Sequence, residues 1–236
     1  MQTPAVATRV LPGTDRLDVT GPLPGAGCVG IELGVAAGGF SARLMATGRF
    51  RHLYGVDAYA DGHGIREYRR ALLAVGLGTP YTLLRMTFAQ ALPLFPPDTF
   101  DFVYCDGYAH TGEEGGTTLT DWYARLKPGG VMAGDDYDAE VWPLVVWAVH
   151  HLAAQVGAEL LLTDRVEDAA YSRYRSWFFV KPADGPTPRP DPMLRDLGLA
   201  ERDRIAAGRK ARRKARRSAA AQDGAQDAER DAAPST

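Results

Sequence analysis

Apolar and polar positions follow two alternating patterns between residues 27 and 181. Short apolar runs predict buried strands, and the segments between them carry apolar residues every three or four positions, which predicts helices. The predicted strands are 29–33, 52–57, 81–85, 100–106, 131–135, 160–163 and 177–181. The predicted helices are one that starts at Ser41, then 65–75, 88–92, 119–126 and 141–156.

This alternation of strands with helices predicts an α/β fold with a parallel sheet covered on both faces. We expect a Rossmann-like, doubly wound and mostly parallel sheet of seven strands. The last two strands are joined only by the polar segment 164–176, which is short for a helical crossover. The final strand is therefore predicted to run antiparallel.

The two ends of the chain lack these patterns. Residues 1–26 contain several prolines and no sustained period, so they are predicted to form a leader or a partial lid. A proline-rich linker begins near residue 183 and leads to a basic tail, which is predicted to be disordered or to form a lone helix. The predicted domains are thus 1–26, 27–182 and 183–236.

The net charge of −2 conceals an uneven distribution, because segment 183–236 is net basic and the remainder is net acidic. An acidic domain is a poor non-specific partner for nucleic acid. Nine basic residues lie within 202–217 and no aromatic residue lies among them, so that segment would contact only the phosphates of a nucleic acid. We expect a solvated charged tail, with RNA, an acidic partner or a membrane surface as the alternative partners.

The two cysteines, Cys28 and Cys105, both lie in apolar runs and are predicted to be buried free thiols, which suits a reducing compartment. The first residues do not combine a basic start with an apolar run, and no apolar stretch reaches membrane-spanning length. A cytoplasmic protein is the expectation.

The first strand of the predicted domain ends in a glycine turn that is typical of a cofactor site. Glu32 lies in the strand, Gly34 and Gly38 lie in the turn, and a helix follows, so backbone N–H groups face a ligand. No lysine follows Gly39, which excludes a P-loop. The second glycine that a pyrophosphate needs is replaced by Ala36, which favours a nucleoside-containing cofactor without phosphates.

Four elements in this order carry a resemblance: E-x-G-x-x-x-G after a strand, Asp57 ending the next strand, Asp106 after the fourth, and L-K-P-G-G before the fifth. Over residues 27–181 the chain resembles the class I S-adenosylmethionine-dependent methyltransferases. The resemblance implies that Asp57 accepts hydrogen bonds from both ribose hydroxyls and that Glu32 and Gly34 cradle the methionine part. The full set of cofactor-binding residues that it implies is Glu32, Gly34, Ala36, Gly38, Asp57, Ala58 and Asp106.

Three acidic residues are predicted to converge at one edge of the sheet. Asp106 follows the fourth strand, and Asp135 and Asp136 end the fifth. Neighbouring carboxylates repel one another unless a cation lies between them, and Mg²⁺ or another divalent cation is the predicted one. The pattern resembles the metal-dependent O-methyltransferases, in the branch that includes methyltransferases of natural-product sugars.

That resemblance implies a reaction. The metal would bind two oxygens of a hydroxylated small molecule, and His110 would take the proton as general base beside Asp106. One extra residue separates Gly107 from His110 compared with the D-G-x-H of that branch. In the alternative interpretation, Asp106 serves only the amino group of the cofactor and the acid pair caps a helix.

Two other functions remain open at the level of the sequence. One is a metal-free RNA methyltransferase that uses the basic tail, and the other is a cofactor-binding or interaction module without turnover. Specificity for the acceptor is predicted to lie in segment 106–116, in segment 164–176, or in a second subunit of a homo-oligomer.

Overall fold

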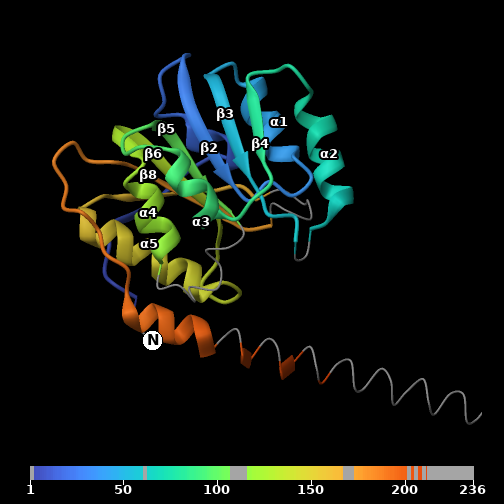
Figure 1. The fold of residues 1–236 in the computed structure, drawn as a ribbon. Coiled ribbons are helices and arrows are strands. Elements are labelled where there is room, and N and C mark those ends of the chain that lie inside the picture. Colours follow the sequence, from blue (N-terminus) through green and yellow to red (C-terminus); the bar gives the residue numbers. More distant parts are fainter. Residues whose placement is uncertain are drawn as a thin grey trace, which may run out of the picture.

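The computed structural model describes residues 3–60, 63–106, 116–166 and 173–200, together with 203, 204, 207, 208 and 211. Eight strands form a single sheet in the order β1-β7-β8-β6-β5-β2-β3-β4 (Figure 1). The strands are β1 (Thr8–Leu11), β2 (Cys28–Leu33), β3 (Phe50–Val56), β4 (Tyr81–Leu84), β5 (Phe100–Cys105), β6 (Leu126–Tyr137), β7 (Leu160–Thr163) and β8 (Arg175–Val180). The helices are η1 (Arg16–Thr20), α1 (Gly39–Ala46), α2 (Ile65–Val75), α3 (Phe88–Ala91), η2 (Leu92–Leu94), α4 (Thr117–Tyr123) and α5 (Pro143–Val156).

The predicted α/β architecture is confirmed, including the direction of the last strand. β8 runs antiparallel to β6 and β7, and the other paired strands are parallel. The number of strands differs from the prediction of seven. β6 is also longer than the predicted strand 131–135, because it already begins at Leu126 and runs to Tyr137.

The additional strand comes from the segment that was predicted to be a leader. β1 pairs in parallel with β7, with Thr8 opposite Leu160, and it extends the sheet at one edge. Within this segment, η1 begins after Asp15, whose carboxylate accepts a hydrogen bond from the backbone N–H of Leu17 at 2.7 Å. The N-terminal segment 3–27 is therefore part of the folded domain.

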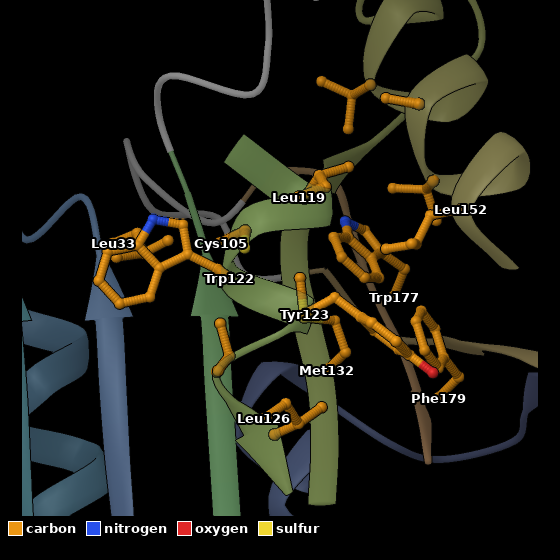
Figure 2. Packing of buried hydrophobic residues seen from close by; sticks show 14 of the residues in the cluster. Leu33, Cys105, Leu119, Trp122, Tyr123, Leu126, Met132, Leu152, Trp177 and Phe179 are labelled. Carbon is orange, nitrogen blue, oxygen red and sulfur yellow. The ribbon is translucent and has the colours of Figure 1, made fainter. Parts of the chain in front are cut away.

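Two hydrophobic clusters cover the two faces of the sheet, as the alternation of side chains along a strand requires. On one face, Cys105, Met132 and Phe179 pack against α3, α4 and α5. Figure 2 shows this packing, with the indole of Trp122 beside Leu33 and Cys105. On the other face, the strands pack against α1 and η1 through a cluster that includes Phe40, Leu44, Phe102, Tyr104, Val19 and Phe178.

The first part of the predicted linker and tail also packs onto the domain. Residues 192–200 form a helix beside α5, drawn in orange in Figure 1, and Leu194 at its start is fully buried. The indole N–H of Trp147 donates to Asp191 Oδ2 at 2.8 Å, and Gln155 forms two hydrogen bonds with the backbone of Arg189. Among the described residues, every helix is too short or too polar to cross a membrane.

Candidate functional site

The glycine turn between β2 and α1 lies against the end of β5. Gly34 has a φ of 90°, in the left-handed region that favours glycine, and a Cβ on it would lie 2.8 Å from the carbonyl oxygen of Asp106. Gly38 has a φ of 78°, and a Cβ there would lie 2.8 Å from the Cα of Ala71 in α2. Both glycines therefore let the turn approach the neighbouring backbone, that of Asp106 or of Ala71, more closely than any residue with a Cβ would allow.

Glu32 is buried directly behind this turn, with 1% of its surface exposed. The hydroxyl of Ser41 donates to Glu32 Oε2, and the hydroxyl of Tyr81 donates to Ser41 Oγ at 3.0 Å. Burial raises the pKa of Glu32 to about 8, and the Ser41 hydrogen bond and the charge of Arg16 oppose this shift. Glu32 thus anchors the start of α1 from inside the protein.

Asp57 follows β3 and holds the same turn from the other side. Its Oδ2 accepts hydrogen bonds from the backbone N–H groups of Val35 at 3.1 Å and Ala36 at 2.9 Å, and its Oδ1 accepts one from Tyr59 at 2.8 Å. A carboxylate has about four acceptor sites, so these three bonds leave capacity for a further donor such as a ribose hydroxyl. The role of Asp57 and Ala58 in binding the ribose stays a prediction.

A guanidinium group lies between two of the three predicted acids. Arg16 of η1 is 6% exposed, and its Nη2 lies 2.8 Å from Asp106 Oδ2 while its Nη1 lies 3.0 Å from Asp135 Oδ2. The guanidinium also lies over two aromatic rings, 4.1 Å from the centroid of Phe40 and 5.1 Å from that of Tyr104. The predicted convergence of Asp106 and Asp135 is therefore confirmed, and the cation between them is the side chain of Arg16.

The electrostatics of this cluster follow from its burial. Burial disfavours the charge of Arg16, but Tyr104, Asp106 and Asp135 outweigh this effect, so the pKa of Arg16 lies above its ordinary value. Burial raises the pKa of Asp135, and Arg16 opposes the rise. Burial also raises the pKa of Asp136 to about 8, with repulsion from Asp106 and Asp135 as the next causes.

The donor set does not fit the predicted Mg²⁺ site. Arg16 holds one oxygen of Asp106 and one of Asp135, and the other oxygen of Asp135 accepts a hydrogen bond from Ser176 Oγ at 3.1 Å. A metal would have to displace the guanidinium in order to use these oxygens. Across the ranges that the structure describes, no three His, Cys, Asp or Glu side chains are grouped in a way that could hold a metal ion.

Two histidines complete the description of the site and its surroundings. His110 lies in segment 107–115, outside the described residues, so its predicted role as a base is not tested. His150 in α5 contacts the carbonyl oxygen of Pro4 through Nδ1 at 2.9 Å and the hydroxyl of Tyr137 through Nε2 at 2.7 Å. Because a carbonyl only accepts, Nδ1 donates to Pro4. These contacts join α5 to the N-terminal segment and to β6.

Sequence reasoning missed four residues that shape the site: Arg16, Ser41, Tyr81 and Ser176. Arg16 is 90 residues from Asp106 along the chain, and Ser176 is 41 from Asp135. The one usable signal was the requirement that converging carboxylates need a cation. The Tyr81 hydroxyl can reach Ser41 because residue 55 is glycine. A Cβ at position 55 would collide with that hydroxyl.

Comparisons with known proteins agree with this architecture. Residues 29–137, slightly less than half of the chain, match a family described as a methyltransferase domain. No curated protein sequence matches the chain significantly.

Solved structures resemble the fold at low sequence identity. The N-methyltransferase NodS from Bradyrhizobium japonicum WM9 is 18% identical, with a TM-score of 0.52 over 71% of this chain and 91% of that one. Its complex with S-adenosyl-L-homocysteine is 19% identical, with a TM-score of 0.51 over 71% and 83% of the two chains. An S-adenosylmethionine-dependent methyltransferase from Mesorhizobium loti is 24% identical, with a TM-score of 0.40, and the match covers half of each chain.

The match of residues 29–137 covers the glycine turn, Asp57 and the acidic cluster of Asp106, Asp135 and Asp136. The mostly parallel sheet with its antiparallel last strand agrees with the resemblance found in the sequence. Residues 29–137 are therefore similar to a methyltransferase domain, and the fold is the Rossmann-like fold of class I methyltransferases such as NodS.

Proposed function

We propose that this protein transfers a methyl group from S-adenosylmethionine to a hydroxyl of a small molecule. One observation carries the proposal: Gly34 of the cofactor turn packs directly on the backbone of Asp106 in the acidic cluster. The expected donor site and the acids thus share one wall at the carboxyl ends of β2, β5 and β6. In an open α/β sheet, ligands bind at this end of the strands.

On the donor side, Gly34, Ala36 and Gly38 would face the methionine part, and Asp57 with Ala58 would face the ribose. S-adenosylmethionine supplies an electrophilic methyl group on a sulfonium when it is bound. The chain holds the turn rigidly for this purpose, through Asp57 outside it and Glu32 behind it. A turn that is fixed before binding loses little entropy when the ligand arrives.

On the acceptor side, Asp106 and Asp136 offer carboxyl oxygens, which accept hydrogen bonds from hydroxyl groups. Such a bond would turn a lone pair of the acceptor oxygen toward the methyl group. In the transfer, the bond from sulfur to the methyl carbon breaks, the bond from oxygen to that carbon forms, and the hydroxyl proton leaves to a carboxylate or to water. Holding the two reactants in near-attack geometry supplies much of the acceleration.

The test begins with calorimetry of the full chain with S-adenosylmethionine and with S-adenosylhomocysteine. Binding is expected, and Asp57→Asn should weaken it by about tenfold or more, because a charged acceptor for the ribose is lost. Asp184→Asn, on the exposed surface after β8, is the matched control and should bind as the wild type does. Equal binding by the Asp57→Asn variant would contradict the assigned donor site.

Transfer is then measured with isotope-labelled S-adenosylmethionine against hydroxylated small molecules, amines and RNA. Labelled ether products support the proposal. Labelled amines or RNA would overturn the acceptor class, and binding of the cofactor without transfer to any acceptor would indicate a module without turnover.

A further inference from the structure

The N-terminal segment places a fixed positive charge inside the candidate site. β1 is paired to β7, and η1 begins at Arg16 immediately after its cap, Asp15. Asp15 also lies 3.8 Å from Arg43 of α1, which joins the segment to the helix that follows the cofactor turn. The segment that carries Arg16 is thus joined both to the edge of the sheet and to α1.

We propose that Arg16 is the resident cation of the acidic cluster: by pairing with the buried Asp135 it holds Asp106 in position for methyl transfer, and it makes the reaction independent of a divalent metal. This inference rests on the proposed function. It extends that function by assigning a role to a segment outside residues 29–137, the part that matches a methyltransferase domain.

The geometry of the guanidinium supports this role. Its two terminal nitrogens each contact a different carboxylate, at 2.8 and 3.0 Å, so one planar group fixes the ends of β5 and β6 relative to each other. Its flat face lies against Phe40 at 4.1 Å. A lysine has a single charged nitrogen and cannot make this fork and this stacking contact together.

The same contacts disfavour a metal at this position. Asp135 is 4% exposed and both of its oxygens are bonded, one by Arg16 and the other by Ser176. A Mg²⁺ ion that used Asp106 and Asp135 would have to stand where the guanidinium now lies. Two cations so close together would also repel each other strongly in this buried environment.

Arg16 acts through the acids and does not contact the reacting atoms, so it is a positioning residue. Removing it would leave two nearby carboxylates without their cation. Loss of one partner from a buried ion pair is among the most damaging single changes in a protein. The effect should appear in kcat more than in the KM of the acceptor, because the position of the acids matters in the transition state.

The experiment uses the full chain and four forms: wild type, Arg16→Met, Arg16→Lys and Arg9→Met. Arg9 lies in β1 on the same segment, is exposed, and pairs only with Glu159 among the contacts described, so it is the matched control. Wild type and Arg9→Met should have the same kcat in EDTA as in Mg²⁺. Arg16→Met should lower kcat by on the order of a hundredfold, and added guanidinium ion should restore part of it.

Arg16→Lys keeps the charge and replaces Arg16→Met in the experiment if that variant does not fold. Arg16→Lys should lower kcat, and added guanidinium ion should not restore it. A purely structural role would lower the melting temperature without rescue by guanidinium. Loss of wild-type activity in EDTA with recovery in Mg²⁺ would overturn the inference, and so would an unchanged kcat in either Arg16 variant.

A second measurement does not depend on activity. Electron paramagnetic resonance with Mn²⁺ as the probe should show no binding of the ion at this cluster in the wild type and new binding in Arg16→Met. Binding of Mn²⁺ to the wild type that disappears in Asp135→Asn would overturn the role of Arg16. If the wild type methylates no acceptor, the proposed function fails, and the Mn²⁺ result still decides whether Arg16 replaces a metal.

Discussion

The substitution Glu32→Gln tests whether the acid behind the cofactor turn is neutral in the folded protein. Glu32 is fully buried and accepts a hydrogen bond from Ser41, and its pKa is raised from an ordinary 4.5 to about 8. Glutamine has nearly the same shape and can still accept from Ser41, but it cannot ionise. The substitution therefore removes the titration and keeps the packing.

The sign and size of the effect follow from linkage. A folded-state pKa above the unfolded one means that the contribution of Glu32 to stability is fully present below about pH 4.5 and is lost as the pH rises through about 8. At about 1.4 kcal/mol for each pKa unit, the loss amounts to roughly 5 kcal/mol, to be taken as an order of magnitude. Relative to the wild type, Glu32→Gln should become more stable as the pH rises.

Urea unfolding followed by tryptophan fluorescence, repeated between about pH 4.5 and pH 9, measures this directly. Burial also raises the pKa values of Asp135 and Asp136, so the stability of both the wild type and Glu32→Gln should fall further as the pH rises. Because this effect is common to both proteins, the difference between their plots of stability against pH isolates Glu32. Glu140→Gln, an exposed position, is the control and should run parallel to the wild type. If Glu32→Gln also runs parallel to the wild type at every pH, the reasoning about Glu32 is wrong.

Two further changes test the packing around the site. Gly134→Ala would place a Cβ 2.5 Å from both the carbonyl oxygen of Cys105 and the indole of Trp177, and should lower the free energy of unfolding by about 1–3 kcal/mol or more. Gly25→Ala is the control and should change the free energy of unfolding little, because there is open space around Gly25. Equal values for the two variants in urea unfolding would contradict this geometry. Leu194→Ala should lower the free energy of unfolding by about 2–5 kcal/mol, because the Leu194 side chain is fully buried. Met193→Ala is the control, because the Met193 side chain is exposed. If residues 192–200 did not pack on the domain, neither variant would lose stability.

The central part of the fold could be predicted from the sequence because its pattern is local. Most parallel strands in residues 28–163 are mainly apolar, and the longer crossover helices carry apolar residues every three or four positions, so this part of the chain has its own signals. The direction of β8 could be predicted from the length of a single connection. The positions of Glu32, Asp57 and Asp106 at the ends of strands followed from the same pattern.

The two terminal segments could not be predicted in the same way. β1 has only four residues, three of them exposed, so it has no apolar run to reveal it. The helix 192–200 has weak but usable signals, since Asp191 and Pro192 are suitable at a helix start and Leu194 and Leu197 are three residues apart. Each segment is held in place by contacts with an element that is distant in the sequence: β1 pairs with β7, and the segment that leads into the helix 192–200 contacts α5.

The acidic cluster shows where physical reasoning from the sequence stops. The argument that Asp106 and Asp135 need a cation between them was correct, because it depends only on their charges and on the geometry of a parallel sheet. The identity of the cation does not follow from that argument, since a metal ion and a guanidinium satisfy the same electrostatic requirement. The choice depends on the path of the N-terminal segment, which brings Arg16 across 90 positions of the sequence to Asp106. A side chain held in this way also differs from a metal in its consequences, because a chelator cannot remove it.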